Sequence, residues 1–132
     1  MEVLASRVLL HPRDHAASRR FYEDVLGLGV FREFGTAGHP GIVFFLGGGL
    51  LELSGSGDAT PSAATRLLLQ VRDVEAEATR LADAGVPVLE APARKPWGLV
   101  EATLTDPDGL QLVLVQIPED HPQRRAGPAA PG

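Results

Sequence analysis

The sequence predicts an α+β fold in which one unit, a strand followed by a helix and three more strands, occurs twice. The first observation is a repeat: residues 6–14 and 65–73 both run from a hydroxyl residue and an Arg through apolar residues to an Arg-Asp pair. The second is that apolar residues at helical spacing follow each copy, and the third is that short apolar runs bounded by Gly or Pro follow each helix. The chain has 132 residues, the length of one domain, so we expect the two units to share a core.

Composition and charge exclude several functions. There is no cysteine, which excludes disulfides, thiolate metal sites and cysteine nucleophiles. The net charge of -5 argues against general nucleic-acid binding and permits a cationic ligand. No apolar run approaches the roughly 18 residues of a membrane span, and no signal-peptide pattern opens the chain. We therefore expect a cytoplasmic protein without nucleic-acid or membrane partners.

In the first unit, residues 3–11 predict a strand because they are rich in Val and Leu and hold no breaker. We expect Asp14 to cap the helix that follows and Gly27 to end it. The next three strands are expected at residues 30–34, 42–46 and 50–54. Alternation along the first strand places Arg7, Leu9 and His11 on one face.

Glu52 lies in the middle of the apolar run 50–54. A carboxylate there is costly unless it is paired, solvated or bound to a ligand. The glycine triplet 47–49 before it predicts a hairpin turn, because no helix with the Lys-Ser/Thr of a phosphate-binding loop follows. Glu52 is thus a candidate functional residue.

The second unit follows a small, polar linker at 57–64. Its first strand, 66–71, places Arg66, Leu68 and Gln70 on one face. Asp73 is expected to cap the helix and Gly85 to end it. The later elements are expected to be a short strand at 87–90, a Pro-containing loop at 91–96, a strand at 97–105 that carries Glu101, a turn at 106–109 and a strand at 110–117. Residues 118–132 are rich in Pro, Ala and Gly and predict a loosely packed tail.

Two motifs carry a family resemblance. Phe21-Tyr22-x-x-Val25-Leu26-Gly27-Leu28 lies on the first helix, and Asp106-Pro107-Asp108-Gly109 precedes the last strand. With the doubled strand-helix-three-strand unit, they make residues 3–117 resemble the vicinal oxygen chelate superfamily, which includes glyoxalase I, extradiol dioxygenases and bleomycin-resistance proteins. The resemblance implies one domain, 1–117, in which module one, 3–56, and module two, 65–117, form a curled mixed sheet with helices on its convex face and a cleft on its concave face.

The resemblance also implies where a metal would bind. Metal-dependent members place a His or Gln on the first strand of each module and a Glu on the last strand. These four positions correspond here to Arg7, Glu52, Arg66 and Val113. Arginine has no lone pair to donate and valine cannot coordinate, so only Glu52 remains and no metal cofactor is expected. The alternative is a displaced divalent-metal site formed by His11, Glu52 and Gln70 or Gln111; against it, His11 could simply make a local hydrogen bond at the strand end.

Two interpretations of the arginines stay open. Arg7 and Arg66 could form ion pairs with Glu52, with or without Glu101, or they could bind a carboxylate or phosphate of a small molecule. Aromatic residues add a second question, because Trp97, Phe34, Phe44 and Phe45 could line a cleft or belong to the core. Val113 and Val115 would give such a cleft an apolar floor, whereas Leu112 and Leu114 would face the helix.

We therefore expect a metal-free protein that binds a small organic molecule, an antibiotic or aromatic metabolite, in the cleft, as a homodimer and without catalysis. One alternative is a lyase or dioxygenase that uses a displaced metal around Glu52. The other is an interaction module whose cleft is closed by Arg–Glu pairs. No catalytic residue is predicted. The predicted ligand-binding residues are Arg7, Leu9, His11, Glu52, Arg66, Leu68, Gln70, Trp97, Glu101 and Val113.

Overall fold

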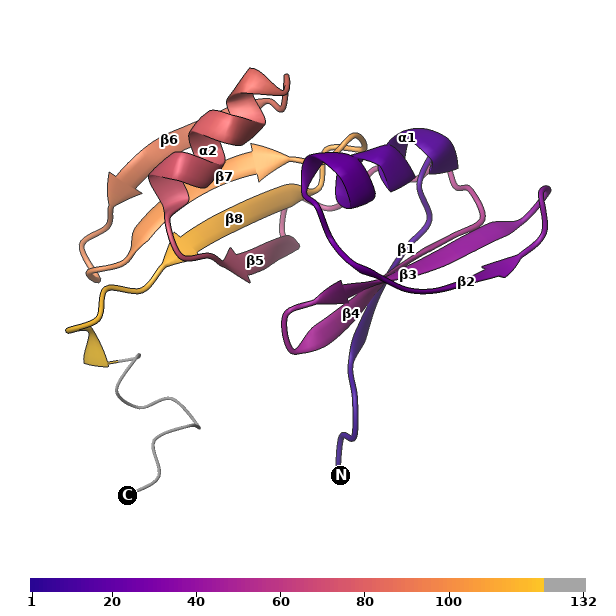
Figure 1. The fold of residues 1–132 in the computed structure, drawn as a ribbon, viewed down its shortest axis with the longest axis horizontal. Helices are drawn as coiled ribbons and strands as arrows, with labels where there is room; N and C mark the ends of the chain where they lie inside the picture. Colours follow the sequence, from indigo (N-terminus) through magenta and orange to yellow (C-terminus); the bar gives the residue numbers. More distant parts are fainter. Residues whose placement is uncertain (123–132) are drawn as a thin grey trace. The chain divides into compact units, whose positions relative to one another are not determined.

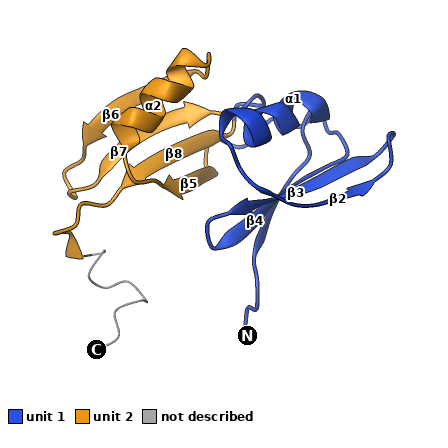
Figure 2. Cartoon of the chain, viewed as in Figure 1, with its two compact units in different colours: residues 1–62, 106–109 blue, residues 63–105, 110–132 orange. Residues whose placement is uncertain are grey.

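The computed structural model describes residues 1–122 and divides into two compact units (Figure 2). Unit 1 comprises Met1–Ser62 together with the turn Asp106–Gly109. Unit 2 comprises Ala63–Thr105 and Leu110–Gly132, and residues 123–132 of it lie outside the described residues. Most of the predicted tail, 118–132, therefore lies outside them as well.

Each unit has the predicted order of a strand, a helix and three strands (Figure 1). In unit 1 the elements are β1 (Arg7–Leu10), α1 (His15–Arg20), a π-helical turn η1 (Phe21–Val25), β2 (Val30–Gly35), β3 (Pro40–Leu46) and β4 (Gly49–Ser54). In unit 2 they are β5 (Arg66–Gln70), α2 (Val74–Asp83), β6 (Val88–Arg94), β7 (Val100–Thr105) and β8 (Gln111–Gln116). The α+β class and the doubled unit are confirmed.

The two units have the same sheet topology. Unit 1 holds a four-stranded sheet in the order β1-β4-β3-β2, and unit 2 holds one in the order β5-β8-β7-β6. The first strand of each unit runs parallel to the last, and the remaining neighbours are antiparallel. A parallel pairing needs a crossover connection, which here includes the helix of each unit.

Both predicted helix caps are confirmed. The Asp14 carboxylate accepts a hydrogen bond from the Ala17 backbone N–H at 3.0 Å, and that of Asp73 accepts one from Ala76 at 3.1 Å. These bonds satisfy N–H groups that have no partner within the helix. Gly85 follows α2 with φ of +88°, a conformation that favours glycine.

Each helix covers one face of its own sheet. In unit 1 the Tyr22 ring lies 6.3 Å from that of Phe44, so Phe44 and the residues in phase with it face the helix. In unit 2 the Gln116 side-chain oxygen accepts a hydrogen bond from the Val74 N–H at the start of α2, so Leu112, Leu114 and Gln116 face that helix. The opposite side of each sheet is called its helix-free face below.

Within unit 1, the two motifs that carried the family resemblance meet. The Tyr22 hydroxyl donates a hydrogen bond of 2.7 Å to Asp106 Oδ2, and both residues are buried. The backbone N–H of Asp108 donates to the other Asp106 oxygen at 2.9 Å, which holds the turn. The tyrosine on the first helix and the aspartate of the turn therefore form one buried contact.

Several predicted boundaries are wrong. β1 begins at Arg7 rather than residue 3, because its partner β4 pairs with it only from Leu50 onward. Residues 91–94, predicted as a loop, belong to β6, where Pro92 is tolerated because β6 is an edge strand. Residues 97 and 98, predicted to open a strand, form the turn before β7, with Gly98 at φ of +91°.

Among the described residues, no helix is both long and apolar enough to cross a membrane.

Candidate functional site

The helix-free face of unit 1 carries most of the residues predicted for that unit. The strand register aligns Arg7 with Leu50 and Phe45 in one row across β1, β4 and β3. The next row aligns Leu9 with Glu52 and Val43. Side chains in register point to the same side of a sheet, so Arg7 and Glu52 are diagonal neighbours on this face.

Arg7 and Glu52 form an ion pair. Arg7 Nη1 lies 2.9 Å from Glu52 Oε1, and the side chains are 36% and 15% exposed. This pairing explains how a carboxylate is accommodated in the apolar strand β4. The ion pair with Glu52 is thus the contact that Arg7 makes in this structure.

His11 makes a local contact. Its ring atom Nδ1 lies 2.9 Å from the backbone oxygen of Ser54, which places the ring at the end of β1 beside the end of β4. Nδ1 must carry the proton to donate this bond. The hydrogen bond supports the local interpretation of His11 over a metal-binding one.

Exposed apolar side chains lie on the same face as the ion pair. Leu9 is 60% exposed, Phe45 51% and Phe31 46%. The Phe31 and Phe45 rings meet edge to face, with centroids 5.3 Å apart. Sequence reasoning missed Phe31, because the register shift between Val30 and Arg32 breaks the simple alternation of β2. Phe44 is fully buried and belongs to the core.

The helix-free face of unit 2 has the same strand register as that of unit 1, with different residues at the aligned positions. Arg66 is aligned with Gln111 and Thr105 across β5, β8 and β7, and Leu68 is aligned with Val113. Arg66 is exposed, and its side chain has no hydrogen-bond or ion-pair partner among residues 1–122. Leu68 is 62% exposed, whereas Val113 is buried with Leu99, Val115 and Ile117.

Glu101 lies at the other end of this face, in register with Val115, which is itself aligned with Gln70. The Glu101 carboxylate accepts a 2.6 Å hydrogen bond from the Trp97 indole N–H, and Trp97 is 57% exposed. The partner of Glu101 is therefore the indole of Trp97. Gln70 is exposed at the end of β5.

The residues at the four family ligand positions do not fit a metal ion. Only Glu52 offers a metal ligand, and its carboxylate already pairs with a guanidinium. Across residues 1–122, no three His, Asp or Glu side chains form a group that could hold a metal.

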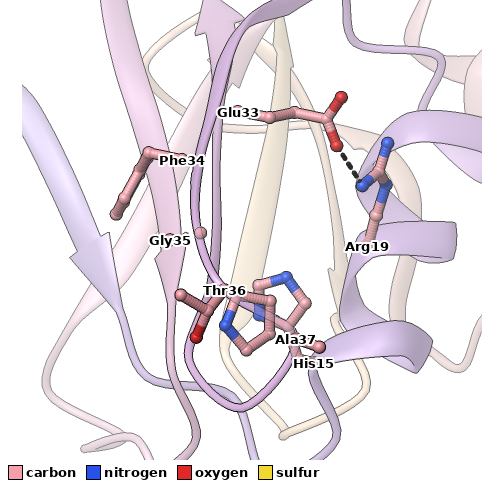
Figure 3. A pocket seen from close by; sticks show the side chains of 9 residues that line it. His15, Arg19, Glu33, Phe34, Gly35, Thr36 and Ala37 are labelled. Atoms are coloured by element: carbon pink, nitrogen blue, oxygen red, sulfur yellow. Dashed lines mark hydrogen bonds and ion pairs between the residues drawn. The ribbon is translucent and has the colours of Figure 1, made fainter.

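A separate pocket lies at the start of α1 against the loop between β2 and β3 (Figure 3). His15 and Thr36 both line it, and Arg19 points toward Glu33, with which it forms an ion pair. Hydrogen bonds to Glu23 and Glu33 raise the pKa of Arg19. None of the predicted ligand-binding residues lines this pocket.

Comparison with known proteins gives a consistent result. The sequence model of the Glyoxalase/Bleomycin resistance protein/Dioxygenase superfamily matches residues 5–114. No curated protein matches the sequence.

Solved structures of similar fold include three named proteins. SMU.1112c has a TM-score of 0.75 and 26% sequence identity, over 87% of this chain and 98% of that one. TnmS3, an antibiotic binding protein from Streptomyces sp. CB03234, has a TM-score of 0.73 and 24% identity over 89% and 98%. A lactoylglutathione lyase from Agrobacterium tumefaciens has a TM-score of 0.65 and 23% identity over 88% and 94%.

Proposed function

The chain belongs to the glyoxalase/bleomycin resistance protein/dioxygenase superfamily, and on that premise we propose that it binds a small organic molecule without a metal and without catalysis. The binding surface is the helix-free face of its sheets. The observation that carries the proposal is the ion pair between Arg7 and Glu52, at 2.9 Å. Of the four family positions, only that of Glu52 carries a side chain that can bind a metal, and this ion pair joins its carboxylate to a guanidinium.

The exposed apolar side chains beside the ion pair indicate the class of ligand. Leu9, Phe31 and Phe45 are each close to half exposed or more on the helix-free face of unit 1. Phe31 and Phe45 contact each other, and Leu9 lies across β4 from them. Apolar and aromatic side chains with a few polar groups are typical of small-molecule sites. An antibiotic or aromatic metabolite fits this surface, and TnmS3 shows that a protein of this fold can bind an antibiotic.

A thermal-shift screen against bleomycin, other antibiotics and aromatic metabolites tests the proposal. A specific ligand must raise the melting temperature by mass action. At a concentration of 100 times Kd, it adds about 2.7 kcal/mol to the free energy of unfolding. Phe45→Ser should remove the shift. Leu4→Ser is the matched control, because Leu4 is 87% exposed and precedes every strand. Hits that are equally strong in both variants would place binding elsewhere.

Metal analysis tests the other half of the proposal. The protein is incubated with Ni, Zn, Mn or Fe(II), dialysed, and measured by elemental analysis. We expect less than stoichiometric metal in both wild type and Glu52→Ala. Stoichiometric metal that is lost in Glu52→Ala would instead support a lyase or dioxygenase with a displaced metal site.

Homodimer formation is part of the proposal. Apolar side chains remain exposed on the edge strands β2 and β6, with Phe31 at 46% and Leu89 at 53%. Exposed apolar edge strands offer a surface for pairing with another chain. Light scattering coupled to size exclusion should give the mass of two chains, and a monomer at micromolar concentration would contradict this part.

A further inference from the structure

The two units differ at one pair of equivalent positions on their helix-free faces. In unit 1 the register pairs Leu9 with Glu52, and in unit 2 it pairs the equivalent Leu68 with Val113. Val113 therefore occupies in β8 the place that Glu52 occupies in β4. The arginine two residues before each leucine is conserved between the units, but its carboxylate partner is present only in unit 1.

The loss of that carboxylate leaves Arg66 as an exposed cation without a partner among the described residues. Its own row supplies two more hydrogen-bonding groups, Gln111 and Thr105, which are half-buried. Neither side chain makes a hydrogen bond within residues 1–122. Neighbouring strands are about 4.8 Å apart, so the guanidinium, amide and hydroxyl can converge on one small group.

We propose that Arg66, Gln111 and Thr105 bind the carboxylate of an organic acid, which takes the part in unit 2 that Glu52 takes in unit 1. This inference rests on the proposed function of the helix-free faces and names the class of ligand that the face of unit 2 binds by itself. A guanidinium forms paired, charge-assisted hydrogen bonds with a carboxylate, and the amide and hydroxyl add neutral donors. The apolar body of the acid lies against Leu68, which is 62% exposed on the same face.

The charge along this face also orients the ligand. Arg66 lies in the first row of the face, and Glu101 lies in the row of Gln70, four residues further along. At about 3.3 Å per residue the two ends are about 13 Å apart. The net charge of -5 repels anions over long distances, but at physiological salt that repulsion is screened beyond about 8 Å. Because Arg66 is cationic and Glu101 is anionic, the acid group of the ligand is directed to the Arg66 end of the face.

Two probes that share one ring system test this inference: 2-naphthoate, which is anionic, and 2-naphthylmethanol, which is neutral. Isothermal titration calorimetry gives both affinities, and proton–nitrogen NMR follows the Arg66 side-chain Nε–H. We expect 2-naphthoate to bind about tenfold more tightly, with a shift of the Arg66 signal. The preference should fall as salt is raised, because it is electrostatic.

Three variants test whether the row of Arg66, Gln111 and Thr105 causes the preference for 2-naphthoate. Arg66→Gln should abolish the preference by lowering the affinity for 2-naphthoate to that for 2-naphthylmethanol. Gln111→Glu should do the same, because it places a carboxylate opposite Arg66. Arg80→Gln, which makes the same charge change on α2, should keep it. Circular dichroism checks that each variant is folded.

Three results would overturn the inference. Equal binding of both probes to the wild type does so while leaving the proposed function standing. A preference that survives Arg66→Gln does so as well. If neither probe binds, the organic-acid assignment fails, and the proposed function is decided separately by the thermal-shift screen.

Discussion

The hydrogen bond between Tyr22 and Asp106 gives the sharpest test of the fold. Tyr22→Phe removes only the hydroxyl, which donates to Asp106 Oδ2 at 2.7 Å, and keeps the ring contacts with Phe21 and Phe44. Tyr22 is 0% exposed and Asp106 6%, so water cannot replace the lost donor. A hydrogen bond to a charged group contributes about 1.5–3 kcal/mol, and we expect the free energy of unfolding to fall by that amount.

The same contact predicts an alkaline dependence of stability. Burial raises the pKa of Tyr22, and the charge of Asp106 acts in the same direction. Below the ordinary tyrosine pKa of about 10, both states keep the proton and the contribution is fully present. Above it only the unfolded state ionises, so this contribution falls by about 1.4 kcal/mol per pH unit. Tyr22→Phe should lack this slope.

Urea unfolding followed by circular dichroism at a series of pH values measures both effects. Because the chain has one tyrosine, tyrosinate absorbance reports on Tyr22 alone and should appear only on unfolding. A double-mutant cycle with Asp106→Asn isolates the pair. A loss below about 0.5 kcal/mol, within the range of ordinary surface substitutions, would refute the buried hydrogen bond. So would a folded protein whose Tyr22 titrates normally.

Two further predictions concern single positions. Asp73→Ala should lower the free energy of unfolding in urea by about 1 kcal/mol, because it removes the cap of α2. Asp83→Ala, at the other end of α2, should be neutral or slightly stabilising. Equal losses in the two variants would contradict the capping role. Gly35→Ala should lower the melting temperature strongly, because Gly35 has φ of +85° and an added Cβ would collide with the His39 backbone oxygen. Gly48→Ala, with open space around it, is the control, and similar melting temperatures for the two variants would show that the loop relaxes freely.

Local patterns in the sequence were sufficient for the elements and for the family. The capping aspartates and the terminating glycine Gly85 act through their own turn of backbone, so their positions along the chain predict their role. The family resemblance rested on two motifs that the structure joins through Tyr22 and Asp106. The boundaries of β1 and β6 were wrong because the length of a strand depends on its partner.

The sequence by itself determined that this protein has a doubled α+β fold. Its resemblance to the superfamily implied that arginines stand at two of the metal-ligand positions. Only the tertiary structure decided that the two arginines differ. Arg7 pairs with Glu52 at 2.9 Å, and Arg66 has Val113 where that carboxylate would be. The physical reason is strand register: which side chains become neighbours depends on how β1 aligns with β4 and β5 with β8, and that alignment follows from long-range pairing rather than from any local pattern.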